Sequence, residues 1–288
     1  MRRRDFATAL ALAGLGQTGV TLAQTPRTGR LKQCVTAGVF DPKMPFEDQC
    51  RLAADLGCAG FDLVQMQDWP VLKKYGLTPT MAPPEASGVT IPNALNAKEN
   101  HERLEKSVRV AIDRCAAAAC PNLITFSGNR RGMAVALLDA EGADNCVAFL
   151  NRVKSQAEDN GVTLCMELLN STVNHKNYMC DHTAWGAGVM QRVNSPRVKL
   201  LYDIYHMQIM EGDVCRTITD NFQWIAHFHT GGVPGRHEID DTQELNYRFV
   251  AKTIADLGFT GYIAHEYRPA PGRDAKESLK QAIDIMTV

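Results

Sequence analysis

The sequence predicts a single α/β domain folded as a (β/α)8 barrel. Short apolar runs alternate eight times with longer amphipathic stretches, as they do where parallel strands are joined by helices. The 288 residues suit one such barrel, which takes about 250 residues before insertions. The last four apolar runs also end in a carboxylate or an imidazole. A doubly wound sheet shows the same alternation and is the second choice of fold.

The predicted strands are apolar runs bounded by glycine, proline or polar residues. In chain order they cover residues 33–40, 60–64, 77–81, 122–126, 162–168, 198–202, 225–229 and 261–266. The run at 198–202 is typical of a strand that is covered on both faces, because a parallel strand between two layers is apolar on both sides.

The predicted helices follow the strands, and five of them end at glycine or proline. They cover residues 46–56, 69–75, 139–160, 183–193, 214–222, 242–257 and 274–286, with one more before Pro121. The helix before Pro121 has the clearest pattern, because apolar residues recur at helical spacing from Leu104 to Ala118. Asn96, with Glu99 three residues later, is its predicted N-cap.

Residues 1–23 are predicted to be a twin-arginine signal peptide. Arg3-Arg4-Asp5-Phe6 fits that pattern, and the apolar stretch after it is too short and too polar to span a membrane. Small residues favour cleavage after Ala23. We therefore expect a linker at residues 24–30, the barrel domain at 31–288, and a periplasmic or secreted protein that is exported in the folded state. The alternative is an uncleaved amphipathic extension.

Nine cysteines do not predict a disulfide framework here, because the number is odd and no CxxC pair occurs. Cys58, Cys115, Cys120 and Cys165 lie in apolar runs, where a thiol acts as a small hydrophobic group. Twin-arginine substrates fold in the reducing cytoplasm, so a fold without disulfides is expected, and a metal loaded before export is compatible with this route. The formal net charge of -1 gives no reason to expect nucleic acid or a membrane surface as partner.

Chemistry-bearing residues stand at the ends of the last four predicted strands. These residues are Glu167, Asp203, His229 and Glu266. In a barrel the carboxyl ends of all strands meet on one face, and active sites are built there. Period-two alternation places His229 on the same face of its strand as His227. It also places Glu266 inward and His265 outward, so the four residues are expected to converge inside the barrel.

Three carboxylates and one imidazole predict one divalent metal ion, Mn²⁺ or Mg²⁺ first, with Co²⁺ and Zn²⁺ as alternatives. The other interpretation is buried ion pairing with Arg236 or Lys199, because an isolated carboxylate is costly in a dry core. For Asp203 and His206 taken alone, a helix-capping aspartate and a surface histidine are the alternative.

The remaining histidines are given structural roles. We expect His101 and His182 on the surface at helix starts, His175 in a polar loop, and His227 in the core with a hydrogen-bond partner.

Six motifs between residues 166 and 269 fall in a recognisable order and spacing. They are Met166-Glu-Leu-Leu-Asn170, Leu201-Tyr-Asp-Ile-Tyr-His206, His227-Phe-His-Thr-Gly231, Pro234-Gly-Arg-His-Glu238, Glu244-Leu-Asn-Tyr247 and His265-Glu-Tyr-Arg-Pro269. Together they resemble hydroxypyruvate isomerases of the xylose isomerase-like TIM-barrel superfamily, which also holds tagatose/psicose 3-epimerases and endonuclease IV. The resemblance covers nearly all of the chain after residue 23. It implies a TIM barrel acting on a small carbohydrate or keto acid, and it allows a homodimer.

The resemblance also implies roles for single residues. The four metal ligands would be Glu167, Asp203, His229 and Glu266. Glu167 and Glu266 would move the proton on opposite sides of the substrate, and His206 and Arg236 would hold substrate oxygens. Hydroxypyruvate isomerases tend to have Gln where this chain has His229, and His there is the habit of the epimerases.

The chemistry fits that set of residues. Interconversion of a 2-hydroxyaldehyde with a hydroxyketone or keto acid removes a proton beside a carbonyl and returns it one carbon away. A divalent ion that binds both oxygens stabilises the resulting enediolate, and metal-bound glutamates are expected to stay ionised. Arg236 is able to pair bidentately with a substrate carboxylate. We therefore expect a metal-dependent isomerase of the hydroxypyruvate isomerase type.

Three other functions share part of the pattern. A sugar epimerase, or a lyase acting on oxidised sugars or glycosides, would use the same proton abstraction, and export favours a substrate from outside the cell. A phosphodiester hydrolase of the endonuclease IV type needs further His and Asp ligands, but Ser127 ends the fourth strand and Gly235 stands where an Asp is expected. A non-catalytic binding protein would have no use for a complete acid–base pair.

Overall fold

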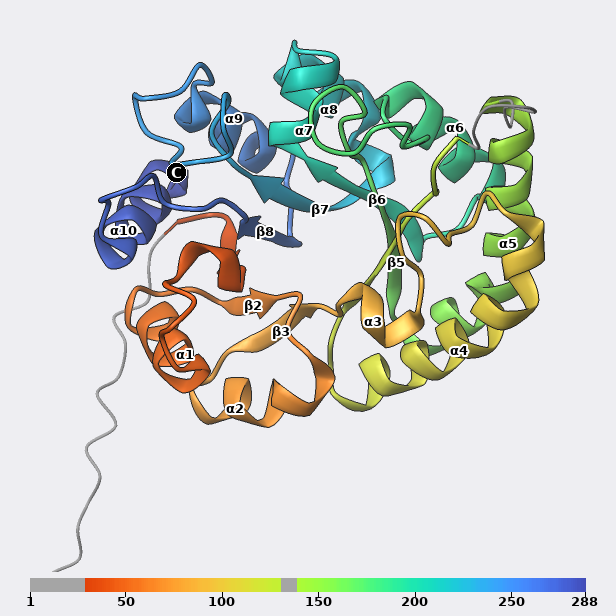
Figure 1. Ribbon diagram of the computed structural model, residues 1–288, viewed down its shortest axis with the longest axis horizontal. Coiled ribbons are helices and arrows are strands. Elements are labelled where there is room, and N and C mark those ends of the chain that lie inside the picture. The colour runs from red at the N-terminus through yellow and green to blue at the C-terminus, as the bar shows by residue number, and fades with distance from the viewer. Residues whose placement is uncertain (1–28, 131–138) are drawn as a thin grey trace, which may run out of the picture.

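The computed structural model describes residues 29–130 and 139–288. Within them, eight parallel strands form a central ring that the helices surround (Figure 1). The predicted signal at residues 1–23, and residues 24–28 of the predicted linker, lie outside the described residues. The predicted (β/α)8 barrel is confirmed.

The strands follow one another around the ring in the order β3-β2-β1-β8-β7-β6-β5-β4. They are β1 Lys32–Val35, β2 Gly60–Asp62, β3 Thr78–Met81, β4 Asn122–Thr125, β5 Thr163–Glu167, β6 Val198–Asp203, β7 Ile225–Thr230 and β8 Tyr262–His265. Ala82, just after β3, forms a parallel bridge with Leu123 in β4. The Ala82 amide donates to the Asn122 carbonyl over 2.8 Å, which nearly closes the barrel between the two end strands.

The helices lie outside the ring and bury one face against it (Figure 1). They are α1 Phe46–Asp55, α2 Trp69–Lys74, α3 Pro84–Ser87, α4 His101–Ala117, α5 Asp139–Asn160, α6 Thr183–Val193, α7 Ile204–Met210, α8 Val214–Asn221, α9 Tyr247–Asp256 and α10 Ala275–Met286. In α4 the predicted apolar face is buried from Leu104 to Cys115. Gly57, Gly161 and Gly258 follow α1, α5 and α9 with positive φ, so these predicted glycine stops are confirmed.

The predicted N-cap at Asn96 is wrong, because α4 begins five residues later at His101. Asn96 is buried and has other partners: its side-chain amide donates to the Asn129 carbonyl and its backbone amide to the Ser127 carbonyl, each over 2.8 Å. His101, expected on the surface, is also buried. Its Nε2 atom lies 2.8 Å from the Leu95 carbonyl oxygen, which ties the helix start to the loop before it.

The strand faces agree with the period-two prediction. His227 and His229 both reach Asp62 on β2 across the barrel interior. His265 is buried on the outer side of its strand, where its Nε2 atom lies 3.0 Å from Gln33 Oε1. The Gln33 amide donates to the Ile283 carbonyl of the covering helix α10. The inward and outward sides of β7 and β8 are therefore those expected.

All nine cysteines lie in the described part of the chain and are free thiols, and eight of them are buried. Cys58, Cys115, Cys120 and Cys165 belong to the apolar core, as the runs around them predict. Among the residues described, no helix is both long and apolar enough to span a lipid bilayer.

Candidate active site

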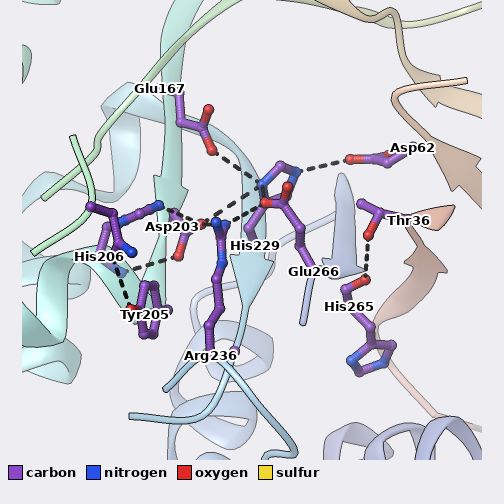
Figure 2. A network of polar contacts seen from close by, with 12 residues as sticks. Thr36, Asp62, Glu167, Asp203, Tyr205, His206, His229, Arg236, His265 and Glu266 are labelled. Atoms are coloured by element: carbon purple, nitrogen blue, oxygen red, sulfur yellow. Dashed lines mark hydrogen bonds and ion pairs between the residues drawn. The ribbon is translucent and has the colours of Figure 1, made fainter. Parts of the chain in front are cut away.

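The four strand-end residues come together inside the barrel. Glu167 and Asp203 end β5 and β6, His229 lies in β7, and Glu266 directly follows β8. Each offers one ligand atom, and these atoms lie within 4.8 Å of one another. Figure 2 shows the three carboxylates turned toward the His229 ring. The convergence predicted from the strand pattern is therefore present.

The His229 ring fits a cation between its Nδ1 atom and the carboxylates. Nδ1 lies 2.6 Å from Glu266 Oε2 and 3.3 Å from Glu167 Oε1, yet it has no hydrogen-bond partner among the described residues. Its Nε2 atom faces the opposite way, 3.0 Å from Asp62 Oδ2. In the neutral ring the proton belongs on Nε2, so Nδ1 presents a lone pair to the carboxylates. Electron-pair donors that face one another in this way suit a divalent ion, and oxygen donors with one imidazole suit Mn²⁺ or Mg²⁺.

Arg236 supplies positive charge at the same place. Its Nη2 atom lies 2.7 Å from both Asp203 Oδ2 and Glu266 Oε2, and its guanidinium stacks on the Tyr205 ring with 5.2 Å to the centroid. The backbone of Arg236 has φ 58°, a left-handed conformation that costs a non-glycine residue about 1–3 kcal/mol. The ion pairing considered for Arg236 is thus present, and it accounts for one of the positive charges that three carboxylates require.

Lys199, the other partner considered for the carboxylates, lies elsewhere. Its Nζ atom donates to the Gln223 carbonyl and stands over the Trp224 ring. It therefore takes no part in the site.

His206 is fully buried next to the cluster, so the alternative interpretation of it as a surface histidine is wrong. Its Nδ1 atom lies 2.6 Å from Asn170 Nδ2. Because an amide nitrogen only donates, Nδ1 accepts, and the ring proton belongs on Nε2. Within the part of the chain that the structure describes, Nε2 has no hydrogen-bond partner, and it points toward Asp203 Oδ2 at 3.6 Å. His206 therefore presents a free N–H donor to the site.

Asp203 has two functions in the fold. Its Oδ1 atom accepts from the His206 amide over 3.2 Å, which caps the N-terminus of α7. Its Oδ2 atom faces the cluster. The capping role and the predicted ligand role, which were treated as alternatives, would use different oxygens of one carboxylate.

The protein's own groups hold the pKa values of the two glutamates apart. Burial raises the pKa of Glu167 to about 7. Burial also raises the pKa of Glu266, but Arg236 and His229 outweigh it and bring that pKa down to about 2. Burial lowers the pKa of His229, whereas Glu266, Asp62 and Glu167 together hold it well above its usual value. The cluster thus favours an added positive charge, and a cation there would also lower the pKa of Glu167.

Sequence reasoning missed Asp62, which ends β2 opposite the cluster. The residue is buried, and its carboxylate lies within 3.0 Å of Nε2 of both His227 and His229. Burial raises the pKa of Asp62, but the two histidines outweigh burial and leave it well below the usual range. A carboxylate directly after the apolar pair Gly60-Phe61 was the available signal. His227 is the hydrogen-bonded core residue that we expected.

His175, expected in a polar loop, packs its ring against His206 with 5.2 Å between centroids. It lies in the loop between β5 and α6 and borders the site. His182 precedes α6, and its side chain is half exposed, as expected.

A cavity of about 390 Å³ opens beside the cluster. Asp62, Arg236 and Glu266 contribute to its wall, together with Thr36 and Tyr267. Its volume is that of a small-ligand site. The cluster and the cavity together form a site for a small polar molecule.

The chain resembles known isomerases in sequence. A family model described as Xylose isomerase-like TIM barrel matches residues 50–287. A Danio rerio protein named "Putative hydroxypyruvate isomerase" is 26% identical over 175 residues, which are 60% of this chain and 63% of the relative. A 2-oxo-tetronate isomerase of Cupriavidus necator is 36% identical over 115 residues, which are 40% of this chain and 44% of the relative. The matches thus span less than two thirds of these relatives' own length.

Solved structures share the architecture. The crystal structure of an AP endonuclease, family 2, from Brucella melitensis superposes with a TM-score of 0.76 at 25% sequence identity. The superposition covers 88% of this chain and 98% of that chain.

Proposed function

Because the chain belongs to the xylose isomerase-like TIM barrel family, we propose that it is a divalent-metal-dependent isomerase. It interconverts a 2-hydroxyaldehyde with a hydroxyketone or keto acid, and its substrates are of the hydroxypyruvate or 2-oxo-tetronate type. The names of its relatives support the substrate class. The metal dependence and the proton-transfer mechanism are our proposals from the site.

One observation carries the proposal: three carboxylates converge on the lone-pair side of the buried His229 ring. Glu266 and Glu167 lie 2.6 and 3.3 Å from Nδ1, and Asp203 lies 3.9 Å away. Glu167, Asp203, His229 and Glu266 would hold one ion, Mn²⁺ or Mg²⁺ in preference to Co²⁺ or Zn²⁺. When bound, the ion would supply positive charge next to the two substrate oxygens on which negative charge develops.

We assign the proton transfer to Glu167 and Glu266. Glu167 ends β5 and Glu266 follows β8, and the two side chains reach the centre from different directions (Figure 2). A substrate between them has a carboxylate on each side, so one can remove the proton beside the carbonyl while the other returns a proton to the neighbouring carbon. Burial of the site keeps bulk water away from the reacting carbons.

We assign substrate binding to His206 and Arg236. The N–H at Nε2 of His206 is a buried donor with no hydrogen-bond partner in residues 29–130 and 139–288, and a substrate oxygen would satisfy it. Arg236 lies at the wall of the 390 Å³ cavity, where a guanidinium can pair with the carboxylate of a keto acid.

Solvent exchange tests this function most directly. The purified full chain is incubated in D₂O with Mg²⁺ or Mn²⁺ and a panel of hydroxypyruvate, 2-oxo-tetronate, neutral ketoses and 3-keto-glycosides. Mass spectrometry should find deuterium in the keto acids, because proton abstraction and return passes through solvent-exchangeable carboxyls. Removal of metal with a chelator should stop the exchange, and Mn²⁺ or Co²⁺ should restore it. Full exchange by metal-free protein would contradict the proposed metal dependence.

A sugar epimerase or lyase is the second candidate. His229 favours it, since the hydroxypyruvate isomerases that the sequence resembles tend to have Gln at this position. The same experiment separates the two by product. Deuterium that enters ketoses or 3-keto-glycosides but not the keto acids would favour the second candidate. The hydrolase alternative has less support, because Ser127 and Gly235 do not offer the further metal ligands that it needs. The Ser127 hydroxyl is buried and already bonded to Gly128 and Cys180, and Gly235 has no side chain.

A further inference from the structure

Asp62 lies outside the four-residue cluster, on the far side of the His229 ring (Figure 2). It comes from β2, whereas the cluster comes from β5 to β8. Its side chain is buried, and its carboxylate is held by protein groups. Its hydrogen bonds decide what it can do.

The Asp62 carboxylate accepts from four donors, two on each oxygen. Oδ1 accepts from the Thr80 hydroxyl and from the Cys34 thiol at 3.5 Å. Oδ2 lies 2.7 Å from His227 Nε2 and 3.0 Å from His229 Nε2. A carboxylate offers about four lone-pair sites, so its acceptor capacity is filled. An ionised carboxylate only accepts, so both histidines must carry their proton on Nε2.

The tautomer of His227 is also determined by the partner of its other ring nitrogen. Nδ1 of His227 lies 3.5 Å from Asn122 Nδ2, and an amide nitrogen can only donate. Both partners of His227 therefore require the same tautomer, with the proton on Nε2. For His229 the same tautomer leaves the lone pair of Nδ1 directed at Glu266 and Glu167.

A second metal ion is the competing interpretation of this region, because ligand atoms of Cys34, Asp62 and His227 lie within 4.8 Å of one another. The hydrogen bonds argue against it. Each lone pair of Asp62 already has a donor, and His227 has a partner at both ring nitrogens. An ion would have to displace several buried hydrogen bonds, each costly to leave unmade. Cys34, Asp62 and His227 are better described as a hydrogen-bonded network than as a metal site.

We propose that Asp62 is a positioning residue for the metal centre: it holds His229 in the tautomer and ring orientation that direct Nδ1 at the ion. This inference rests on the metal site of the proposed function. Carboxylates that hold metal-bound histidines in this way typically contribute 10- to 100-fold, in order of magnitude, to metal affinity or activity. Thr80 and Cys34 contact the other oxygen of Asp62, and no hydrogen bond joins either of them to His229 in the described residues.

The wild-type protein gives the first test without any substitution. The chain is labelled with ¹⁵N-histidine and loaded with Zn²⁺, which is diamagnetic, and long-range ¹H–¹⁵N spectra report which ring nitrogen carries the proton. We expect the His229 proton on Nε2 and the metal-induced shift on Nδ1, with His229→Gln used to assign the signals. A proton on Nδ1 in the loaded protein would overturn the proposal.

Mn²⁺ affinity of three variants gives the second test. Asp62→Ala removes the acceptor, so Mn²⁺ binding should weaken about 10- to 100-fold. Asp62→Asn keeps one acceptor oxygen for the histidines if its amide nitrogen faces Thr80, because the Thr80 hydroxyl can accept a hydrogen bond. The Mn²⁺ affinity of Asp62→Asn should therefore lie between the affinities of Asp62→Ala and wild type. Thr80→Val is the matched control, because it deletes a hydrogen bond to the same carboxylate without touching His229. The Mn²⁺ affinity of Thr80→Val should stay within about twofold of the wild-type affinity, which is close to the smallest difference between variants that can be interpreted.

The outcomes separate this inference from the proposed function. Wild type that binds no Mn²⁺ would remove the proposed metal site, and the role of Asp62 would fall with it. Wild type that binds Mn²⁺, together with Asp62→Ala of equal affinity, would overturn only the role of Asp62. Equal losses in Asp62→Ala and Thr80→Val would mean a general packing effect and would also overturn it. If Asp62→Ala does not fold, Asp62→Asn and the wild-type tautomer decide.

Discussion

At the scale of single residues, Glu167 and Glu266 carry the proposed proton transfer. Replacement of either by Gln keeps the side-chain size but removes the carboxylate that takes up a proton. We expect kcat to fall by roughly 10²- to 10⁴-fold, with a melting temperature close to that of wild type. Steady-state kinetics and calorimetry measure the two quantities. Glu277→Gln, on the exposed first turn of α10, is the control and should keep the wild-type kcat.

A fall of less than about tenfold in either variant would contradict the paired-carboxylate mechanism, because it lies below the range of general acid–base catalysis. A large fall in one variant alone would leave a single proton-transfer group and would contradict it as well.

Arg236 tests substrate charge. Removal of a charge-assisted hydrogen bond to a substrate carboxylate costs about 1.5–3 kcal/mol, which is about 10- to 100-fold in an equilibrium constant. We expect Arg236→Ala to raise KM by that factor for a keto acid and by less for a neutral ketose, and the neutral ketose serves as the internal control. Kinetics on both substrates check this. An equal rise for both would mean that Arg236 acts mainly by offsetting the charge of Asp203 and Glu266.

The sequence predicts part of this site, and the reason differs from residue to residue. Glu167, Asp203 and His229 were found because each stands at the end of a long apolar strand. Asp62 was missed because the predicted strand ran from 60 to 64, which placed this carboxylate inside a strand, whereas β2 ends at Asp62. Its partner His227 is 165 positions away, and no local pattern carries a contact of that separation.

At the scale of elements, β2 determines where Asp62 stands, and Gly60 determines how closely β2 approaches β3. A Cβ atom at Gly60 would lie 2.3 Å from the Thr78 carbonyl oxygen and 2.5 Å from Thr80 Cγ2. We expect Gly60→Ala to lower the free energy of unfolding by about 1–3 kcal/mol, because the strand pair must separate. Urea denaturation followed by circular dichroism measures it.

Gly188, in α6, is the matched control, since a Cβ there meets nothing within 4 Å. Gly188→Ala should raise the free energy of unfolding by about 0.5–1 kcal/mol through helix propensity. A neutral Gly60→Ala would mean that β2 and β3 adjust without cost.

Element bounds were predicted less well than element types, for local physical reasons. The helix expected at 242–257 begins at Tyr247, because the Asn246 side chain accepts from the Phe249 amide and caps it there. The strand expected at 33–40 ends at Val35, and a 3-10 turn, Ala37–Val39, uses the remaining apolar residues. Apolar content alone does not separate a strand from a buried turn.

At the scale of the whole molecule, the barrel was predictable because strand–helix alternation leaves few arrangements that bury every strand on both faces. The closure could not be read from the sequence. It depends on Ala82, a residue just beyond the predicted third strand, and on its bridge to Leu123. Once the ring closes, the strand ends share one face, and residues that are distant in the chain form one site.

Export concerns the whole chain. We propose that residues 1–23 direct the folded protein through the twin-arginine route. The nine cysteines of the described barrel are free and mostly buried, so the fold does not depend on oxidation after export.

We expect the full chain, expressed in a bacterium with this route, to appear in the periplasmic fraction cleaved after Ala23, with Gln24 as its first residue by mass spectrometry. Arg3→Lys combined with Arg4→Lys keeps the charge but changes the twin-arginine pair, so that variant should stay in the cytoplasm, uncleaved. Arg2→Lys, just outside the pair, is the control and should be exported. Equal export of the double variant would exclude the twin-arginine route, and wild type that stays uncleaved in the cytoplasm would favour an amphipathic extension instead.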